Sequence, residues 1–434
     1  VREERYELSD PLTPQRYPKS LQQTSDFNST LPLAKWLSPS VNYSMTTNEN
    51  NNLTVTTATI GTSSQTFDVG QVKSVTRSAQ GAASLTLNMN DLMPSNRLLR
   101  SMVLSSSYQL QDGDSWNYVE KDFDTRHSLW IRDSLKPANP YAQRSTLTMR
   151  DTVNSSQRWQ PFEGYSFAGP AGALGTLNIT DNYTISKQRS EVTGTVTRTQ
   201  NRTFPDMIVS MSQLEKLLRA QGWAQNSTVN LKYSQNTNET REVSVETTKS
   251  YGLDLRSKVL QLVDSAISYN LKLSQYEDLS AGAVTKRSRH DDATVQGAFD
   301  HGKFHFTPKV DYVSDITKGT LGATTANTKT LTPSLLVKTD LQLPKGLKLP
   351  FTDKIIALTN RIVWTTTLSY AIKSSPITSA DNTRLFSLTS SADYEAAKNL
   401  RLTFNAGLQR LWSKHVKEDE YMSYQAGSTL TFQF

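Results

Sequence analysis

The chain has 434 residues, a formal net charge of +7 and no cysteine, so a disulfide-stapled scaffold is excluded. No apolar run approaches the roughly 20 residues that a transmembrane helix needs. Lys and Arg are dispersed along the chain and are not clustered among aromatic residues, which argues against nucleic acid as a partner.

Residues 1–30 are polar, contain Pro11, Pro14 and Pro18, and show no sustained hydrophobic period. This pattern predicts an extended linker or the start of a fragment. Residues 2–5 are all charged, where a signal peptide would carry its apolar segment. We therefore expect the C-terminal part of a longer exported protein.

Residues 31–123 alternate between apolar and polar side chains and predict β-strands. A possible short helix interrupts them at 91–102, where Leu98, Leu99 and Met102 share one side. The predicted strands lie around 39–47, 53–60, 71–78, 83–89, 103–110 and 115–123.

Residues 124–172 are the least regular part of the sequence. Their aromatic residues stand among prolines and glycines, as in Trp159 to Phe167. We predict either a packed loop or a plug segment inside a lumen, although such a length is unusual for a structureless loop.

Residues 173–434 return to strands, with a second short helix at 212–220. Alternation is clearest where Ile267, Tyr269 and Leu271 are separated by Ser268 and Asn270. Such segments run for roughly 9 to 14 residues, close to the span of a tilted membrane strand. Their polar positions carry Lys, Asp and Asn, which the core of a sandwich could not bury unpaired.

These patterns predict an all-β fold: an antiparallel transmembrane β-barrel, the C-terminal portion of a large outer-membrane barrel, with two short helices. We expect about 18 to 20 strands. Trp364 and Tyr370 stand near opposite ends of one apolar face. They are predicted to be membrane-interface aromatics.

The stretch 421–434 is predicted to be the closing strand of that barrel. Its alternate residues are apolar or aromatic, interrupted only by Ser428. The spacing of its polar residue, glycine and apolar positions resembles the closing and assembly signal of bacterial outer-membrane barrels. The alternative is the edge strand of a soluble sandwich, which would expose an apolar edge to water. The predicted signal residues are Gln425, Gly427, Leu430, Phe432 and Phe434.

The sequence predicts no enzyme, no cofactor and no metal site. His301 and His305 have the i, i+4 spacing of a helical metal site. On a strand, however, four residues span about 13 Å, too far for two nitrogens to share one ion. Neither a phosphate-binding loop nor a GxSxG motif is present.

The C-terminal strands resemble the giant outer-membrane β-barrel translocon of the type IX secretion system, the gliding-motility cell-surface protein SprA family. The similar segments are FSLTSSADYEAAKNLRLTFNAGLQRLW (386–412), with its Ser391-Ala392-Asp393-Tyr394, and YQAGSTLTFQF (424–434). LAKWLSPSVNYS (33–44) and RTFPDMIVSMSQLEKLL (202–218) resemble internal segments of that family.

This resemblance implies a protein-translocation pore that passes folded secreted or surface proteins across the outer membrane of a Gram-negative-type bacterium. It implies as partners outer-membrane lipid, the barrel-assembly machinery, cargo proteins, and periplasmic or surface subunits. It implies no cofactor. Two alternatives stay open: another outer-membrane barrel (a porin, or a nutrient or lipopolysaccharide-export channel), and a β-rich surface adhesin.

Overall fold

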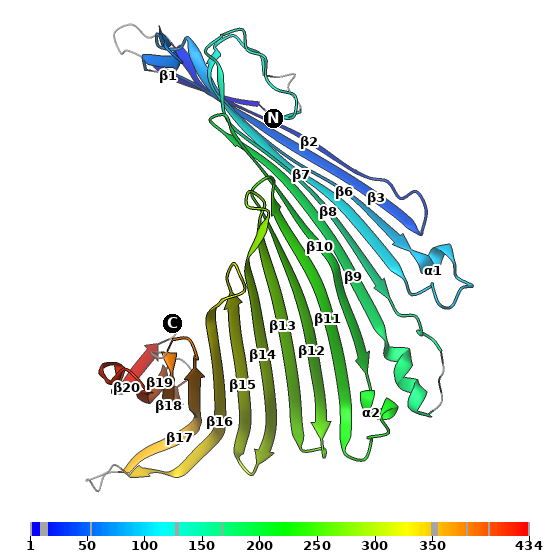
Figure 1. The fold of residues 1–434 in the computed structure, drawn as a ribbon, viewed down its shortest axis with the longest axis vertical. Helices are drawn as coiled ribbons and strands as arrows, with labels where there is room; N and C mark the ends of the chain where they lie inside the picture. Colours follow the sequence, from blue (N-terminus) through cyan, green and yellow to red (C-terminus); the bar gives the residue numbers. More distant parts are fainter. Residues whose placement is uncertain are drawn as a thin grey trace.

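The computed structural model describes residues 2–8, 16–52, 54–125, 130–165, 167, 169–348, 355–378, 381–397 and 400–432. Its main feature is a single antiparallel sheet of 18 strands, in which each strand pairs with the strands that precede and follow it in the sheet. Figure 1 shows this sheet as a broad arch that is open on one side. A small two-stranded hairpin is not part of this sheet but packs against it.

The strands of the main sheet are long, most of them 14 to 20 residues. The strands are β1 Arg2–Leu8, β2 Arg16–Thr30, β3 Leu37–Asn51, β6 Val72–Asn88, β7 Val103–Glu120, β8 Gln143–Trp159, β9 Asn178–Val192, β10 Thr195–Ser212, β11 Ala224–Thr240, β12 Ser244–Val259, β13 Val263–Asp278, β14 Ala283–His301, β15 Phe304–Lys318, β16 Thr324–Lys348, β17 Ile355–Ser374, β18 Thr383–Ala397, β19 Leu400–Ser413 and β20 Tyr421–Phe432, with the separate hairpin β4 Thr56–Ile60 and β5 Ser63–Phe67.

Helical structure is confined to the connections between strands. Among the residues that the structure describes, its elements are α1 Met89–Leu92, α2 Leu214–Leu217 and the 3-10 helices η1 Gly169–Thr176 and η3 Lys417–Asp419. Across the described ranges, no helix combines the length and apolar character needed to cross a membrane. The predicted all-β class, with one antiparallel sheet and few helices, is confirmed.

Several predicted boundaries are wrong because the strands run further than their apolar segments. The pairs 71–78 with 83–89, and 103–110 with 115–123, are the single strands β6 and β7. The predicted lengths of 9 to 14 residues describe only the apolar part of each strand. Both expected helices, 91–102 and 212–220, are reduced to the four-residue turns α1 and α2, and turns or irregular backbone make up nearly all the rest of each range.

Two expected irregular regions contain strands. Residues 2–8 form β1 and residues 16–30 form β2. The predicted linker is therefore wrong for these two ranges. Within 124–172, residues 143–159 form β8, whose polar composition hid its alternation. The segment expected at 53–60 forms β4, which pairs with β5 outside the main sheet.

The buried core is local, and it lies under the connection between β7 and β8. Ile131 of this connection packs against Met45, Ala79 and Leu147. By register, those three positions belong to the sheet face that also carries Leu110. The connection therefore covers the far end of the apolar face, and the alternative of a plug inside the lumen is wrong for its described part.

Buried charges in the same region are paired. The fully buried Arg77 donates from Nε to Asp114 Oδ1 at 2.8 Å, and Trp116 Nε1 donates to Asp114 Oδ2 at 2.8 Å. Lys73 donates to Glu49 Oε2 at 2.8 Å. Each buried charge is therefore held by a partner, as the cost of an unpaired buried charge requires. Arg77 also donates to the carbonyls of Ile131 and Asp133, which ties the connection to the sheet.

Candidate functional site: the two faces of the sheet

One face of the sheet carries continuous rows of apolar side chains. Cross-strand partners point to the same side, so a row can be followed from strand to strand. One row crosses from β8 to β17 through Trp159, Ile179, Val209, Leu231, Leu253, Tyr269, Ala293, Tyr312, Leu331 and Ile372. A second crosses β16 to β20 through Leu335, Leu368, Leu388, Leu408 and Tyr424. We call this the apolar face.

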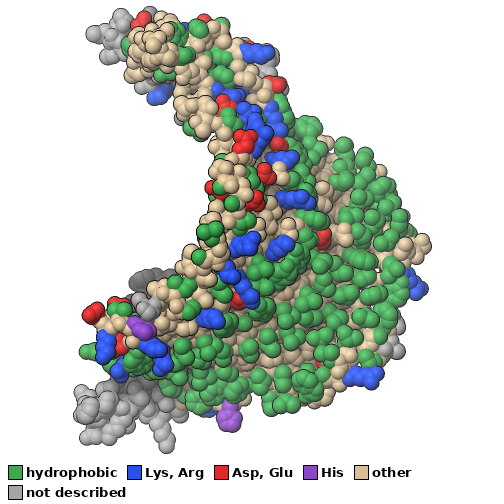
Figure 2. Space-filling view, in the orientation of Figure 1, with side chains coloured by type: hydrophobic (Ala, Val, Ile, Leu, Met, Phe, Trp, Pro, Cys, Tyr) green, Lys and Arg blue, Asp and Glu red, His purple; other side chains and the backbone are tan. Residues whose placement is uncertain are grey.

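Over β11 to β20, no described part of the chain covers the apolar face with a second layer. Leu231, Val295 and Phe404 remain 50%, 53% and 51% exposed, respectively. Figure 2 shows the hydrophobic side chains as one expanse over the bulging side of the arch. An exposed patch of this extent is far larger than a soluble monomer carries, so it marks contact with lipid or another apolar partner.

Trp364 and Tyr370 both lie on the apolar face of β17, six residues and therefore about 20 Å apart along the strand. Trp364 Nε1 donates to Ser390 Oγ at 2.7 Å. The ring of Tyr370 meets that of Trp412 at 6.4 Å, and Arg410 lies 4.9 Å from the Trp412 ring centre. Aromatic and cationic groups therefore meet at the Tyr370 end, and the interface assignment of Trp364 and Tyr370 stays a prediction.

The predicted closing-strand residues divide between the two faces of β20. Leu430 lies opposite Leu402 on the apolar face. Gln425 and Gly427 lie on the other face. The backbone of Phe432 pairs with Leu400, and Phe434 lies outside the described residues. In the described part of the chain, β20 pairs only with β19, and β1 only with β2. These edge strands lie apart in Figure 1.

The opposite face, which we call the polar face, is lined by charged and hydroxyl side chains. Its charges are balanced between neighbouring strands or along one strand. The pairs are Lys232–Asp254 at 2.7 Å, His290–Asp315 at 2.6 Å, His305–Asp300 at 2.7 Å, Lys309–Asp311 at 2.9 Å and Arg401–Asp393 at 2.8 Å. Most of these groups are partly exposed, so each pair adds little stability, and together they make a wettable surface.

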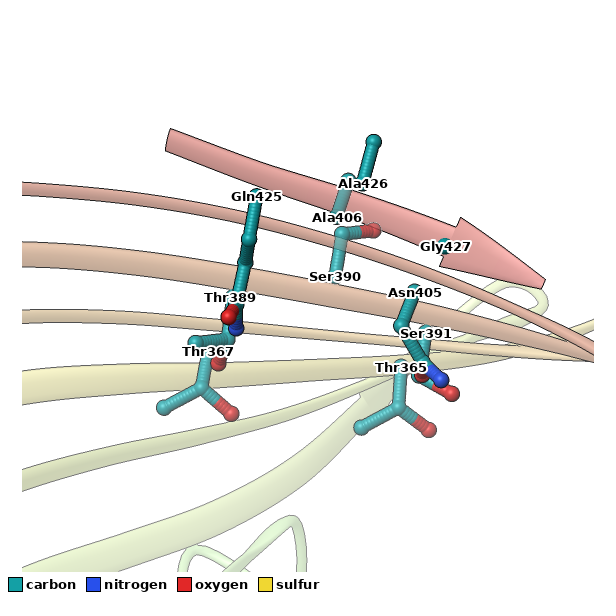
Figure 3. A pocket seen from close by; sticks show the side chains of 10 residues that line it. All are labelled: Thr365, Thr367, Thr389, Ser390, Ser391, Asn405, Ala406, Gln425, Ala426 and Gly427. Atoms are coloured by element: carbon teal, nitrogen blue, oxygen red, sulfur yellow. The ribbon is translucent and has the colours of Figure 1, made fainter. Parts of the chain in front are cut away.

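One part of the polar face, on β17 to β20, is uncharged. Figure 3 shows two ladders of hydroxyl and amide side chains that line one groove. By register, the ladders are Thr367, Thr389, Gly407 and Gln425, and Thr365, Ser391, Asn405 and Gly427. A Cβ on Gly407 would meet the side chain of Gln425 at 3.0 Å. The glycine therefore leaves room for the Gln425 amide.

The histidine prediction needs a correction. His301 ends β14 and His305 lies on β15, so the two are not on one strand. His305 is opposite Asp300 on the polar face, whereas His301 is opposite Phe304 on the apolar face. Opposite faces, not distance along a strand, keep the two apart. Across the described residues, no group of three His, Asp or Glu side chains is arranged to hold a metal ion.

A buried carboxylate in α2, between β10 and β11, fixes the connection between these two strands. Glu215 of α2 is 8% exposed and accepts a bond from the backbone N–H of Ser227 at 2.9 Å. Burial raises its pKa, but hydrogen bonds from its own N–H and from Ser227 and Asn226 outweigh burial and lower it below the usual range.

Two groups of functional interest were missed by the sequence reasoning. One is the buried Arg77–Asp114 pair, and the other is an arginine row across β9, β10 and the turn after β11, with Arg189 opposite Arg198. Strand pairing brings the members of each group together, so only the register of the sheet reveals them.

No protein-family model and no curated protein matches the chain. Among solved structures, the ferric enterobactin receptor of Pseudomonas aeruginosa aligns at a TM-score of 0.31 and 10% identity, covering 95% of this chain and 70% of that one. The siderophore receptor PiuA of Acinetobacter baumannii aligns at 0.29 and 10%, covering 96% and 79%. The ferric yersiniabactin uptake receptor FyuA of Yersinia pestis aligns at 0.21 and 10%, covering 95% and 63%. TM-scores this low assign no role to any residue of this chain.

Proposed function

We propose that this chain is part of the wall of an outer-membrane β-barrel, with its apolar face towards lipid and its polar face towards a lumen. The observation that carries the proposal is the single-layer sheet with one uncovered apolar face and one charged face. A soluble sandwich would pack the apolar face against a second sheet. In a membrane, lipid covers that face, and strand pairing satisfies the backbone.

We further propose that the lumen is a protein-translocation pore of a type IX-like system. A closed barrel of 16 to 18 strands is about the size of a porin. Here 18 strands form a sheet whose two edge strands lie apart, which supports a lumen wider than that of a porin. The resemblance of 386–412 and 424–434 to the SprA family supports the same proposal. The partners are outer-membrane lipid, the assembly machinery, secreted cargo, and periplasmic or surface subunits. No catalytic residue takes part.

The test is passage of a folded protein across a lipid bilayer. The protein is reconstituted into vesicles that enclose a folded fluorescent protein and a small dye, and release of each is followed. Release of both is expected for a translocation pore. Release of the dye alone would refute the translocation pore and favour a porin-sized channel. Saturable binding of ferric enterobactin would instead favour an uptake receptor. A protein that stays monodisperse without detergent would refute the membrane barrel itself and favour an adhesin.

A further inference from the structure

Three arginines stand side by side on β9, on β10 and in the turn after β11, on the sheet side that carries the apolar rows. Arg189 of β9 lies directly opposite Arg198 of β10. The backbone N–H of Arg241, in the turn after β11, donates to the carbonyl of Arg198 at 3.0 Å, which places Arg241 opposite Arg198. Like charges directly opposite on a sheet repel and are destabilising, so this arrangement favours a bound anion.

The surrounding groups leave the row with excess positive charge. The three arginines and Lys187 line one groove of about 310 Å³ together with two carboxylates, Asp151 and Glu239. Asp151 is already held by Arg132 at 2.6 Å. The groove is therefore lined by four cations and two carboxylates, one of which is held by Arg132. Outside this lining, Arg241 pairs with Glu242 at 3.2 Å.

The arginines themselves keep hydrogen-bonding capacity. Arg189 shares Glu191 with Arg144, at 3.2 Å and 3.0 Å respectively, and its Nε is buried without a hydrogen-bond partner. Arg198 is exposed, and among the described residues it has no ion-pair partner. Guanidinium groups with free donors match the geometry of phosphate oxygens.

The row lies just beyond the end of the apolar face. On β9, Ile185 is the last apolar position on that side, and Tyr183 behind it meets Phe204 of β10 at 5.5 Å between ring centres. Four residues separate Ile185 from Arg189, about 13 Å along the strand, or about 10 Å in depth for a tilted strand. Figure 2 shows Lys and Arg side chains gathered along this border of the hydrophobic expanse.

We propose that Arg189, Arg198 and Arg241 bind the phosphate groups of a phosphorylated glycolipid headgroup at the membrane surface. This inference rests on the proposed membrane barrel. The depth favours a glycolipid, because the headgroup layer of a phospholipid is only about 5–8 Å thick on each side. A phosphate carried on a sugar reaches further from the hydrocarbon, to the level of the arginine row.

The test measures binding of the full chain in neutral detergent to lipid A, a bisphosphorylated diglucosamine lipid, with dephosphorylated lipid A and phosphatidylglycerol as comparisons. The variant pair is Arg198→Gln with Arg241→Gln. Its matched control is Arg256→Gln with Lys272→Gln, which removes the same charge from the polar face. Loss of two charge-assisted hydrogen bonds is expected to weaken lipid A binding at least about tenfold, with no change in the control.

Several outcomes would overturn the proposal. These are equal losses for the two variant pairs, binding of dephosphorylated lipid A as tight as that of lipid A, or binding of phosphatidylglycerol as tight as that of lipid A. Insertion of the unchanged protein into phosphatidylcholine vesicles is measured in parallel. Failure of that insertion refutes the membrane barrel, whereas normal insertion without lipid A preference refutes only the arginine site.

Discussion

The lipid-facing assignment of the apolar face predicts a large effect for one charge placed on it. Phe404 lies on that face of β19, 51% exposed, between Ala392 on β18 and Ser428 on β20. It is six residues from Arg410, which is about 20 Å along the strand and about 15 Å in depth at a tilt near 40°. Since the apolar band of such barrels is about 25 Å tall, Phe404 lies close to its midplane.

Replacing Phe404 with Arg should therefore lower the free energy of unfolding in lipid by about 2–4 kcal/mol. That loss corresponds to about a 30- to 700-fold shift in the folding equilibrium. The neighbouring position offers a matched control, because Asn405 points to the polar face. Asn405→Arg introduces the same group at the same depth, where water can solvate it, and should change stability by less than about 0.5 kcal/mol.

The assay is guanidinium unfolding of the protein in phosphatidylcholine vesicles, followed by tryptophan fluorescence and by heat-modifiable migration in SDS gels. Equal destabilisation by the two substitutions would mean that the two faces meet the same medium. In that case neither face touches lipid, and the membrane assignment fails.

Three further results are expected. Arg77→Met leaves the Asp114 carboxylate buried and unpaired, which should cost about 3–5 kcal/mol and let protease cut within 130–142 at a lower denaturant concentration. Since the folded pKa of Glu215 is lowered, its stabilisation is present above its unfolded value of about 4.3 and is lost as the pH falls further. Hydrogen exchange at α2 should accelerate below that pH in the parent and be independent of acid in Glu215→Gln. Deleting residues 431–434 should reduce the protein in the outer-membrane fraction at equal synthesis, whereas Ser428→Ala should leave it unchanged; undiminished insertion would refute the closing-strand assignment.

The sequence predicted the sheet well wherever one face of a strand was apolar. The alternation of Ile267, Tyr269 and Leu271 with polar neighbours placed these residues correctly on one face of β13. The total of about 18 to 20 strands agrees with the 18 strands of the main sheet and the separate hairpin. Periodicity failed where a strand is polar on both sides, as in β2 and in much of β8. There the hydrogen bonds to neighbouring strands, and not an apolar face, decide the structure.

The candidate site residues were predictable only one strand at a time. The alternation of apolar and polar residues predicts which face of the sheet carries Trp364, Tyr370 and Leu430, and the strand register agrees. Their partners do not follow from it, because Trp412 and Ser390 reach them from neighbouring strands. The arginine row was invisible for the same reason: Arg189, Arg198 and Arg241 are separated in sequence and meet only through pairing.

One face of this sheet has two different covers, and the change between them explains where the buried charges lie. Over β11 to β20, residues such as Leu231 and Phe404 are left open for lipid, and no protein layer packs on them. Further along β3 to β8, the same face continues beyond the apolar rows, where lipid cannot cover it. There the connection after β7 covers Met45 and Ala79 with Ile131. The backbone carbonyls of this connection need hydrogen-bond donors once they are buried. Arg77 donates to the carbonyls of Ile131 and Asp133 and also pairs with Asp114. The buried pairs Arg77–Asp114 and Lys73–Glu49 therefore lie where protein replaces lipid as the cover.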